Sequence, residues 1–210
     1  MKCLGRLVLF LAAVTLCGCA AGEFDSYMQR METAMREQFS GGSGSGPVNE
    51  ESVRASMDSL ATELQRQFSN RVFVNIQRGE EGVIIDWQSD AIFDPSSTAM
   101  KPGSYQEINR LAEVLLIYPD TSVFISAHTD SDGPEALNQT TSQRRAEIIR
   151  NTLLSQRLPA VRLTAQGFGE SQPVVDNRTL AGKQQNRRIV ITILPNKTNS
   201  ESVHSRDVAL

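Results

Sequence analysis

The sequence contains few of the residues on which disulfide, metal and redox chemistry depend. It has three cysteines, two histidines and one tryptophan among 210 residues. Cys3, Cys17 and Cys19 all lie close to the N-terminus, so the rest of the chain has no thiol. A disulfide framework or a zinc cluster needs several Cys or His residues at regular spacing. We therefore expect no disulfide, no metal and no cofactor.

The sequence also lacks an excess of basic charge and a long apolar run. The formal net charge is −3 and the isoelectric point is about 5.5. Proteins that bind nucleic acids normally carry a basic patch and a high isoelectric point, so we expect no nucleic-acid partner. A transmembrane helix needs about 20 consecutive apolar residues, and no stretch of the sequence has that length. We predict no transmembrane helix.

The N-terminus has the pattern of an export signal. Lys2 and Arg6 precede an apolar run over residues 7–16, which has the length of a signal-peptide core. The Leu-Cys-Gly-Cys that follows resembles a bacterial lipobox, which implies a signal peptide over residues 1–18 and a lipid on Cys19. Ala20 is not the aspartate that retains many lipoproteins in the inner membrane. The resemblance thus implies a lipid anchor in the outer membrane and a domain in the periplasm; an ordinary secreted protein with an incidental cysteine is the alternative.

Two amphipathic helices are predicted in the region 19–70. Apolar residues at helical spacing form a first stripe at Phe24, Met28, Met31, Met35 and Phe39, and a second at Val53, Met57, Leu60, Ala61, Leu64 and Phe68. A flexible Gly/Ser-rich linker at 40–47 separates them. We expect the second helix to pack on the following domain. The first helix is too short to be stable alone in water, and self-association, membrane contact and a protein partner all remain open for it.

Strands and amphipathic helices alternate over residues 71–195. The expected strands are 72–76, 83–87, 123–127, 161–166 and 189–194, and the expected helices are 104–118 and 138–154. This alternation predicts an α/β domain with helices on one face of a sheet. The polar tail 196–210 is predicted to be disordered.

Ordered motifs in this domain resemble the OmpA-like peptidoglycan-binding family. The matching residues, in order and at the family spacing, are Thr129, Asp130, Gly133, Asn138, Ser142, Arg145, Ala146, Gly167, Gly169, Pro173, Asn177, Thr179, Gly182, Asn186, Arg187 and Arg188. The sequence departs from the pattern at Thr141, where Leu is usual, and at Lys183, where Arg is usual. The resemblance implies a βαβαβ mixed sheet with helices on one face. It also implies a ligand, the diaminopimelate of the peptidoglycan stem peptide.

Diaminopimelate ends in an ammonium and a carboxylate on one carbon, so its site needs a fixed anion and a fixed cation. By the resemblance, Asp130 accepts hydrogen bonds from the ammonium, and Arg145 takes the carboxylate with two parallel N–H bonds, which a lysine cannot form. The resemblance implies further hydrogen bonds from residues around the pocket, namely Asp94, Ser96, Thr129, Asn138 and Arg187. The neighbouring Arg144 is expected to be a surface charge, and only one of the adjacent Arg187 and Arg188 is expected to face the site.

Four other functions are weaker alternatives. His128 and Asp130 suggest a hydrolytic dyad, but no cysteine or nucleophile-elbow pattern accompanies them, so we do not expect an enzyme. Asp130 to Gly133 suggests a calcium loop, but it lacks the late Glu of an EF-hand. A wall-docked interaction subunit of a larger envelope machine, acting through the helix at 24–39, is the main alternative to a simple tether. A domain that has kept the fold and lost the ligand is the last.

Overall fold

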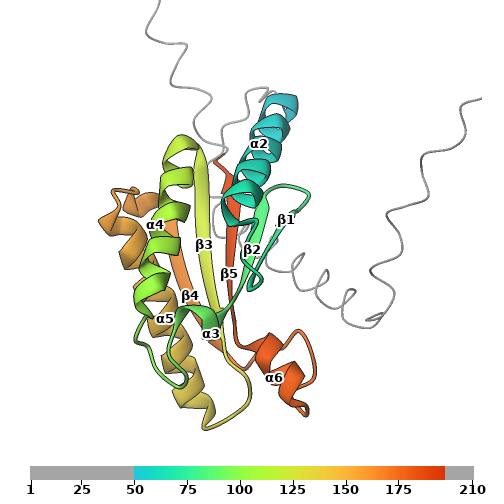
Figure 1. The fold of residues 1–210 in the computed structure, drawn as a ribbon, viewed down its shortest axis with the longest axis vertical. Helices are drawn as coiled ribbons and strands as arrows, with labels where there is room; N and C mark the ends of the chain where they lie inside the picture. Colours follow the sequence, from blue (N-terminus) through green and yellow to red (C-terminus); the bar gives the residue numbers. More distant parts are fainter. Residues whose placement is uncertain (1–49, 197–210) are drawn as a thin grey trace, which may run out of the picture. The chain divides into compact units, whose positions relative to one another are not determined.

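The computed structural model describes residues 50–196, which form a five-stranded sheet with helices packed against it (Figure 1). In chain order the elements are α2 (Glu50–Phe68), β1 (Val74–Arg78), β2 (Val83–Gln88), α3 (Ser89–Ile92), α4 (Pro102–Ile117), β3 (Thr121–His128), α5 (Glu135–Ser155), η1 (Ala160–Arg162), β4 (Leu163–Gly169), α6 (Leu180–Asn186) and β5 (Arg188–Pro195). None of the helices in residues 50–196 is long and apolar enough to cross a membrane.

The sheet is mixed and has the strand order β1-β2-β5-β3-β4. The last strand, β5, runs antiparallel to both of its neighbours, with Ile191 opposite Ile85 of β2 and Ile125 of β3. The pair β3 and β4 is parallel. A parallel pair needs a crossover connection, and here α5 supplies it. Because β5 is antiparallel to β3, the start of β5 lies beside the end of β3.

The hydrophobic core lies between one face of the sheet and the helices α2, α4 and α5. Alternate residues of the strands point into it, for example Ile189, Ile191 and Ile193 of β5, all with no exposed surface. Leu111 of α4 and Ile149 of α5 are equally buried and complete the same cluster. The predicted fold class, a mixed α/β sheet with helices on one face, is therefore confirmed.

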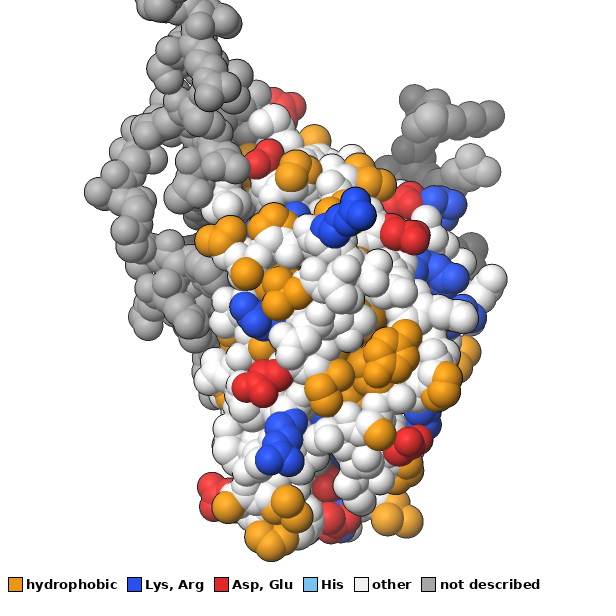
Figure 2. Space-filling view, turned by 90° about the vertical axis from the view of Figure 1, so that its left-hand side faces the viewer, with side chains coloured by type: hydrophobic (Ala, Val, Ile, Leu, Met, Phe, Trp, Pro, Cys, Tyr) orange, Lys and Arg blue, Asp and Glu red, His pale blue; other side chains and the backbone are white. Residues whose placement is uncertain are grey.

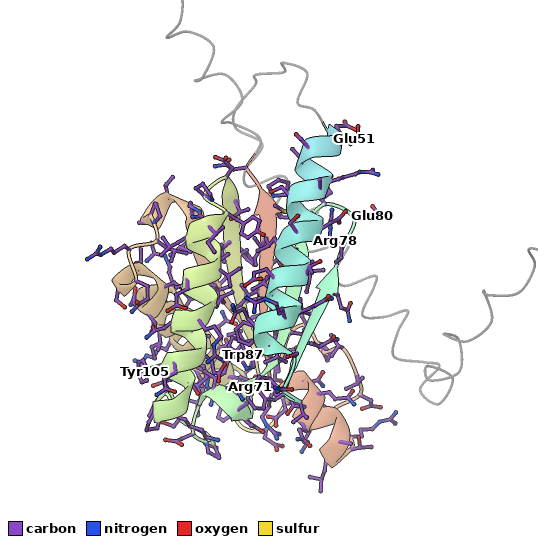
Figure 3. The ribbon with its side chains drawn as sticks, turned by 45° about the horizontal axis from the view of Figure 1, so that its top comes forward. Glu51, Arg71, Arg78, Glu80, Trp87 and Tyr105 are labelled. Atoms are coloured by element: carbon purple, nitrogen blue, oxygen red, sulfur yellow. The ribbon has the colours of Figure 1, made fainter. Side chains whose placement is uncertain are left out.

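The second predicted helix, α2, packs on the domain, as expected. Its apolar stripe, from Met57 through Leu60 and Leu64 to Phe68, is buried in the common core. The ring of Phe68 meets Trp87 of β2 edge-on, with 5.5 Å between centroids, and Trp87 lies beside the last turn of α2 (Figure 3). The core thus extends N-terminally beyond residue 71, where the sequence placed the beginning of the domain. The expected signal peptide, Cys19, the helix at 24–39, the linker at 40–47 and the tail after Asn196 lie outside the described residues.

Several elements differ from the sequence-based expectation. Strand β1 begins at Val74, two residues later than predicted, because the preceding residues form a turn in which the Val74 amide donates to the Arg71 carbonyl at 3.4 Å. The helices α3 and α6 and the turn η1 were not predicted. Each of α3 and η1 spans four residues or fewer, and α6 is mostly polar, so none has a readable apolar period. The hydroxyl of Thr179 accepts from the Gly182 amide and so caps the start of α6.

Candidate functional site

The predicted site residues gather at one end of the sheet, where four segments meet. The loop after β3 carries Thr129 and Asp130, and the first turns of α5 carry Asn138. Arg187 lies directly before β5. The pairing of β5 with β3 begins at Ile189, which lies opposite Ala127. The fourth segment is α3 with the loop at 94–99. This end is the lower end of the sheet in Figure 1, where α3 lies.

Arg187 bridges two carboxylates. Its Nε donates to Asp90 Oδ1 and Oδ2 at 3.1 and 2.9 Å, and its Nη2 donates to Asp90 Oδ2 at 2.6 Å. Its Nη1 donates to Asp130 Oδ2 at 2.7 Å. The hydrogen bonds to Asp90, and secondarily those to Asp130, raise the pKa of Arg187, so it remains a cation. The site therefore contains a fixed ion triad of two anions and one cation.

Asp130 is held firmly in the loop after β3 and is almost fully buried. Its side chain is buried to all but a small fraction, and its Oδ1 accepts the backbone N–H of Asp132 at 3.1 Å. Asn138 supports the loop from α5, because its Nδ2 donates to the Asp130 carbonyl at 3.3 Å and to Glu170 Oε2 at 2.5 Å. Asp130 is thus an oriented carboxylate, and residues 50–196 fill only some of its acceptor positions.

Arg145 lies in the interior, while its neighbour Arg144 is exposed. Its Nε and Nη2 both donate to the Ser97 carbonyl, at 2.9 and 2.6 Å, and its Nη1 donates to Ser89 Oγ at 3.1 Å. A longer contact of 3.5 Å joins Nη2 to the Asp94 carbonyl. The guanidinium also lies over the Phe93 ring, 5.2 Å from its centroid. Arg145 therefore ties α5 to the 89–97 segment.

The charges of the ion triad act on the pKa of Arg145. Burial lowers its pKa, the nearby charges of Asp90 and Asp130 act in the opposite direction, and Arg187 lowers it further. Asp130 and Arg145, the anion and the cation expected to hold the two ends of the ligand, do not bond each other among the described residues. Asp130 bonds Arg187, and Arg145 bonds backbone carbonyls. The two groups contribute opposite charges to one region without neutralising each other by contact.

The remaining predicted residues differ in how far the structure engages them. Thr129 donates its backbone N–H to the Gly169 carbonyl at 2.9 Å, and its buried hydroxyl has no hydrogen-bond partner among the residues the structure describes. Asp94 and Ser96 lie in the exposed loop, where Ser96 adopts a positive φ of 54°. Arg188 points elsewhere, with its guanidinium donating to the carbonyls of Asn186 and Gln172, so only Arg187 faces the site.

Sequence reasoning missed three charged residues at this end of the sheet. Asp90 binds Arg187 but lies in α3, outside the recognised motifs. Glu170 bonds Asn138, and Lys183 forms an ion pair of 2.6 Å with Asp132. Lys183 is one of the two departures from the family pattern, and it links α6 to the loop after β3. The Asp132–Lys183 pair is formed across 51 positions, which no local pattern reveals.

The surroundings of His128, the acidic residues and the surface charge bear on the alternatives of a hydrolytic dyad, a metal site and a nucleic-acid interface. The ring of His128 is buried and stacks on Phe168 with 5.2 Å between centroids, and burial lowers its pKa well below the usual range. A buried ring that stacks in this way is a packing element rather than one half of an exposed dyad. Within residues 50–196, no group of three or more His, Cys, Asp or Glu side chains is arranged to hold a metal ion. The face shown in Figure 2 mixes acidic, basic and apolar side chains rather than gathering a basic patch.

Comparison with known proteins identifies relatives over this same region. The OmpA family matches residues 92–187, which include Asp94, Thr129, Asp130, Asn138, Arg145 and Arg187. The outer-membrane lipoprotein YfiB of Pseudomonas aeruginosa is 33% identical over 114 residues, which cover 54% of this chain and 68% of that protein. Outer membrane porin F of Pseudomonas fluorescens is 41% identical over 110 residues, which cover 52% of this chain and 34% of the porin.

A third relative carries a functional name. The peptidoglycan-binding protein ArfA of Mycobacterium bovis is 31% identical over 101 residues, which cover 48% of this chain and 31% of ArfA. The chain thus spans only about a third of the length of porin F and of ArfA.

A solved structure, of a MotB-like protein from Desulfovibrio vulgaris, shares the fold with a TM-score of 0.64 at 20% identity, covering 73% of this chain and 99% of that one. The sequence motifs, the sheet topology and the similarity to YfiB agree, and the chain belongs to the OmpA family.

Proposed function

We propose that this chain binds peptidoglycan non-covalently through the end of the sheet at Asp130, and that a lipid on Cys19 tethers the wall to the outer membrane. The observation that carries the proposal is the gathering of oriented opposite charges there, with Asp130 on one side and the buried Arg145 on the other. Such an arrangement suits a zwitterion that carries an ammonium and a carboxylate close together. No catalytic group takes part in this function.

Asp130 is the group proposed to receive the ammonium of diaminopimelate. Its carboxylate has about four acceptor positions, and Arg187 and the Asp132 amide use two of them. A charge-assisted hydrogen bond to an ammonium contributes about 1.5–3 kcal/mol net. The partial burial of Asp130 strengthens this interaction, because water screens the charge less there.

Arg145 is the group proposed to receive the carboxylate. Of its contacts, the one to the Asp94 carbonyl is the longest at 3.5 Å, so it is the easiest for a ligand to replace. The shorter bonds to Ser97 keep the guanidinium in place, while the ligand carboxylate replaces the Asp94 carbonyl as an acceptor. Thr129, whose buried hydroxyl has no described partner, is well suited to a further hydrogen bond, and Asn138, Asp94, Ser96 and Arg187 border the same end.

A handful of such bonds gives roughly micromolar affinity after the cost of association, which is modest for a permanent attachment. The wall is a repetitive polymer, and many lipid-anchored copies at one membrane bind it with avidity. Two or more acyl chains would hold each copy stably in the membrane. A weak site on each copy is therefore sufficient for a tether.

Co-sedimentation with purified sacculi tests the proposal. The chain from Ala20 onward, without lipid, is compared with Asp130→Ala and Arg145→Ala at low and moderate salt. Arg144→Ala and Asp58→Ala serve as matched controls, because both residues are exposed, Arg144 beside the buried arginine and Asp58 on α2. We expect the wild type and both controls to sediment and the two site variants to remain in solution. If the wild type does not sediment, or the site variants sediment as well as it does, the proposal is wrong.

A further inference from the structure

The ion triad gives Asp90 a definite place in the site. Asp90 takes Nε and Nη2 of Arg187, while Asp130 takes only Nη1. Asp90 thus accepts more of the hydrogen bonds of the guanidinium than Asp130 does. These bonds are the main reason why the pKa of Arg187 is raised. Neither the family motifs nor the sequence patterns point to Asp90.

We propose that Asp90 is a positioning residue of the peptidoglycan site, which neutralises Arg187 so that Arg187 does not cancel the attraction of Asp130 for the ligand ammonium. The inference rests on the proposed function and adds a residue to it. The triad of Asp90, Arg187 and Asp130 carries a net charge of −1, because two carboxylates flank one guanidinium. Without Asp90 the same guanidinium would neutralise Asp130 alone, and the attraction for a second cation would fall.

The fold holds Asp90 in place by its backbone as well as by Arg187. The Ser89 amide donates to the Arg187 carbonyl at 2.9 Å, which joins the start of α3 to the residue before β5. Lys101 Nζ donates to the Asp90 carbonyl at 2.5 Å from the residue preceding α4. These bonds fix the Asp90 carboxylate toward Arg187. The short helix α3 therefore presents this carboxylate to Arg187, in addition to the Ser89 hydroxyl that bonds Arg145.

The other charged groups near the triad do not replace Asp90. Arg145 is bonded to the Ser97 carbonyl, and Lys183 is paired with Asp132. Glu170 accepts from Asn138. Among the described ion pairs, Asp90 and Asp130 are the two carboxylates that bond Arg187. The attraction of the Asp130 carboxylate for a second cation therefore depends on Asp90 in particular.

The test is a charge-compensation cycle measured by calorimetric titration with a stem tripeptide that ends in meso-diaminopimelate. The proteins are the chain from Ala20 onward, Asp90→Asn, Arg187→Gln and the double variant, with Asp58→Asn as a control for the loss of one carboxylate. We expect Asp90→Asn to weaken binding about tenfold, equivalent to ~1.4 kcal/mol. The double variant restores the net charge of −1, and we expect it to bind more tightly than Asp90→Asn alone.

The outcomes separate this inference from the proposed function. If the wild type does not bind the tripeptide, the proposed function fails. If the wild type binds and Asp90→Asn binds equally well, Asp90 has no part in the site. If Asp90→Asn binds weakly and the double variant no better, while Arg187→Gln alone binds as tightly as the wild type and circular dichroism shows all three folded, the charge argument is wrong.

Discussion

Arg145→Lys is expected to destabilise the domain, although it keeps the charge. The guanidinium makes three hydrogen bonds of 3.1 Å or less, two to the Ser97 carbonyl and one to Ser89, and lies over Phe93. A lysine ammonium can keep one bond to Ser97. The loss of two charge-assisted bonds at about 1.5–3 kcal/mol each, with part of a cation–π contact of ~0.5–1 kcal/mol, gives about 3–7 kcal/mol.

Urea unfolding of the wild type and Arg145→Lys measures this loss, with Arg144→Lys as the surface control. Hydrogen exchange adds a local readout, because the amides of Asp94 and Ser97 are bonded within the loop that Arg145 holds. We expect both amides to exchange faster in Arg145→Lys and to be unchanged in the control. If Arg145→Lys unfolds within about 0.5 kcal/mol of the wild type, the bonds to the loop are not what holds Arg145 in place.

Two further predictions concern residues away from the site. Burial raises the pKa of Asp86 from 3.8 to about 6, against the opposing charge of Arg188. Ionised Asp86 therefore lowers the free energy of unfolding. This penalty is complete above about pH 6 and disappears as the pH falls toward 4. We expect Asp86→Asn to raise the free energy of unfolding by about 1–3 kcal/mol at pH 7.5. Its melting temperature should change less between pH 4 and 6 than that of the wild type. A melting temperature at pH 7.5 equal to or lower than that of the wild type would contradict this. A Cβ on Gly167 would lie 2.1 Å from the Gln143 backbone nitrogen. We therefore expect Gly167→Ala to push β4 away from α5 and to lower the free energy of unfolding in urea by about 1–3 kcal/mol. The control is Gly103→Ala, which should cost no stability because a Cβ there has no atom within 4 Å.

The sequence predicted the sheet and the residues on the loop after β3 because both have local signals. A short apolar run rich in β-branched residues marks a strand such as β5. The spacing of Asn138 and Arg145 places them about two turns apart on the same side of one helix, α5. These residues therefore reach one end of the sheet together.

The sequence could not predict the partners of these side chains. Asp90 and Arg187 are 97 positions apart, and neither the length of α3 nor its composition marks Asp90 as a ligand of an arginine. Arg145 bonds the backbone carbonyl of Ser97, a group that every residue possesses, so no side chain in the sequence reveals the pairing. The roles expected for Asp130 and Arg145 toward a ligand stay predictions, whereas the contacts that hold the two side chains in the fold were not predictable from local patterns.

The most direct test of the central claim compares two stem tripeptides, one ending in meso-diaminopimelate and one ending in lysine. Both present the side-chain ammonium proposed to bind Asp130, but the lysine peptide lacks the carboxylate proposed to bind Arg145. Calorimetric titration of the chain from Ala20 onward should give at least ~10-fold tighter binding for the diaminopimelate peptide, and Asp130→Asn should lose binding to both. Equal affinity for the two peptides, or no binding of either, would contradict the account.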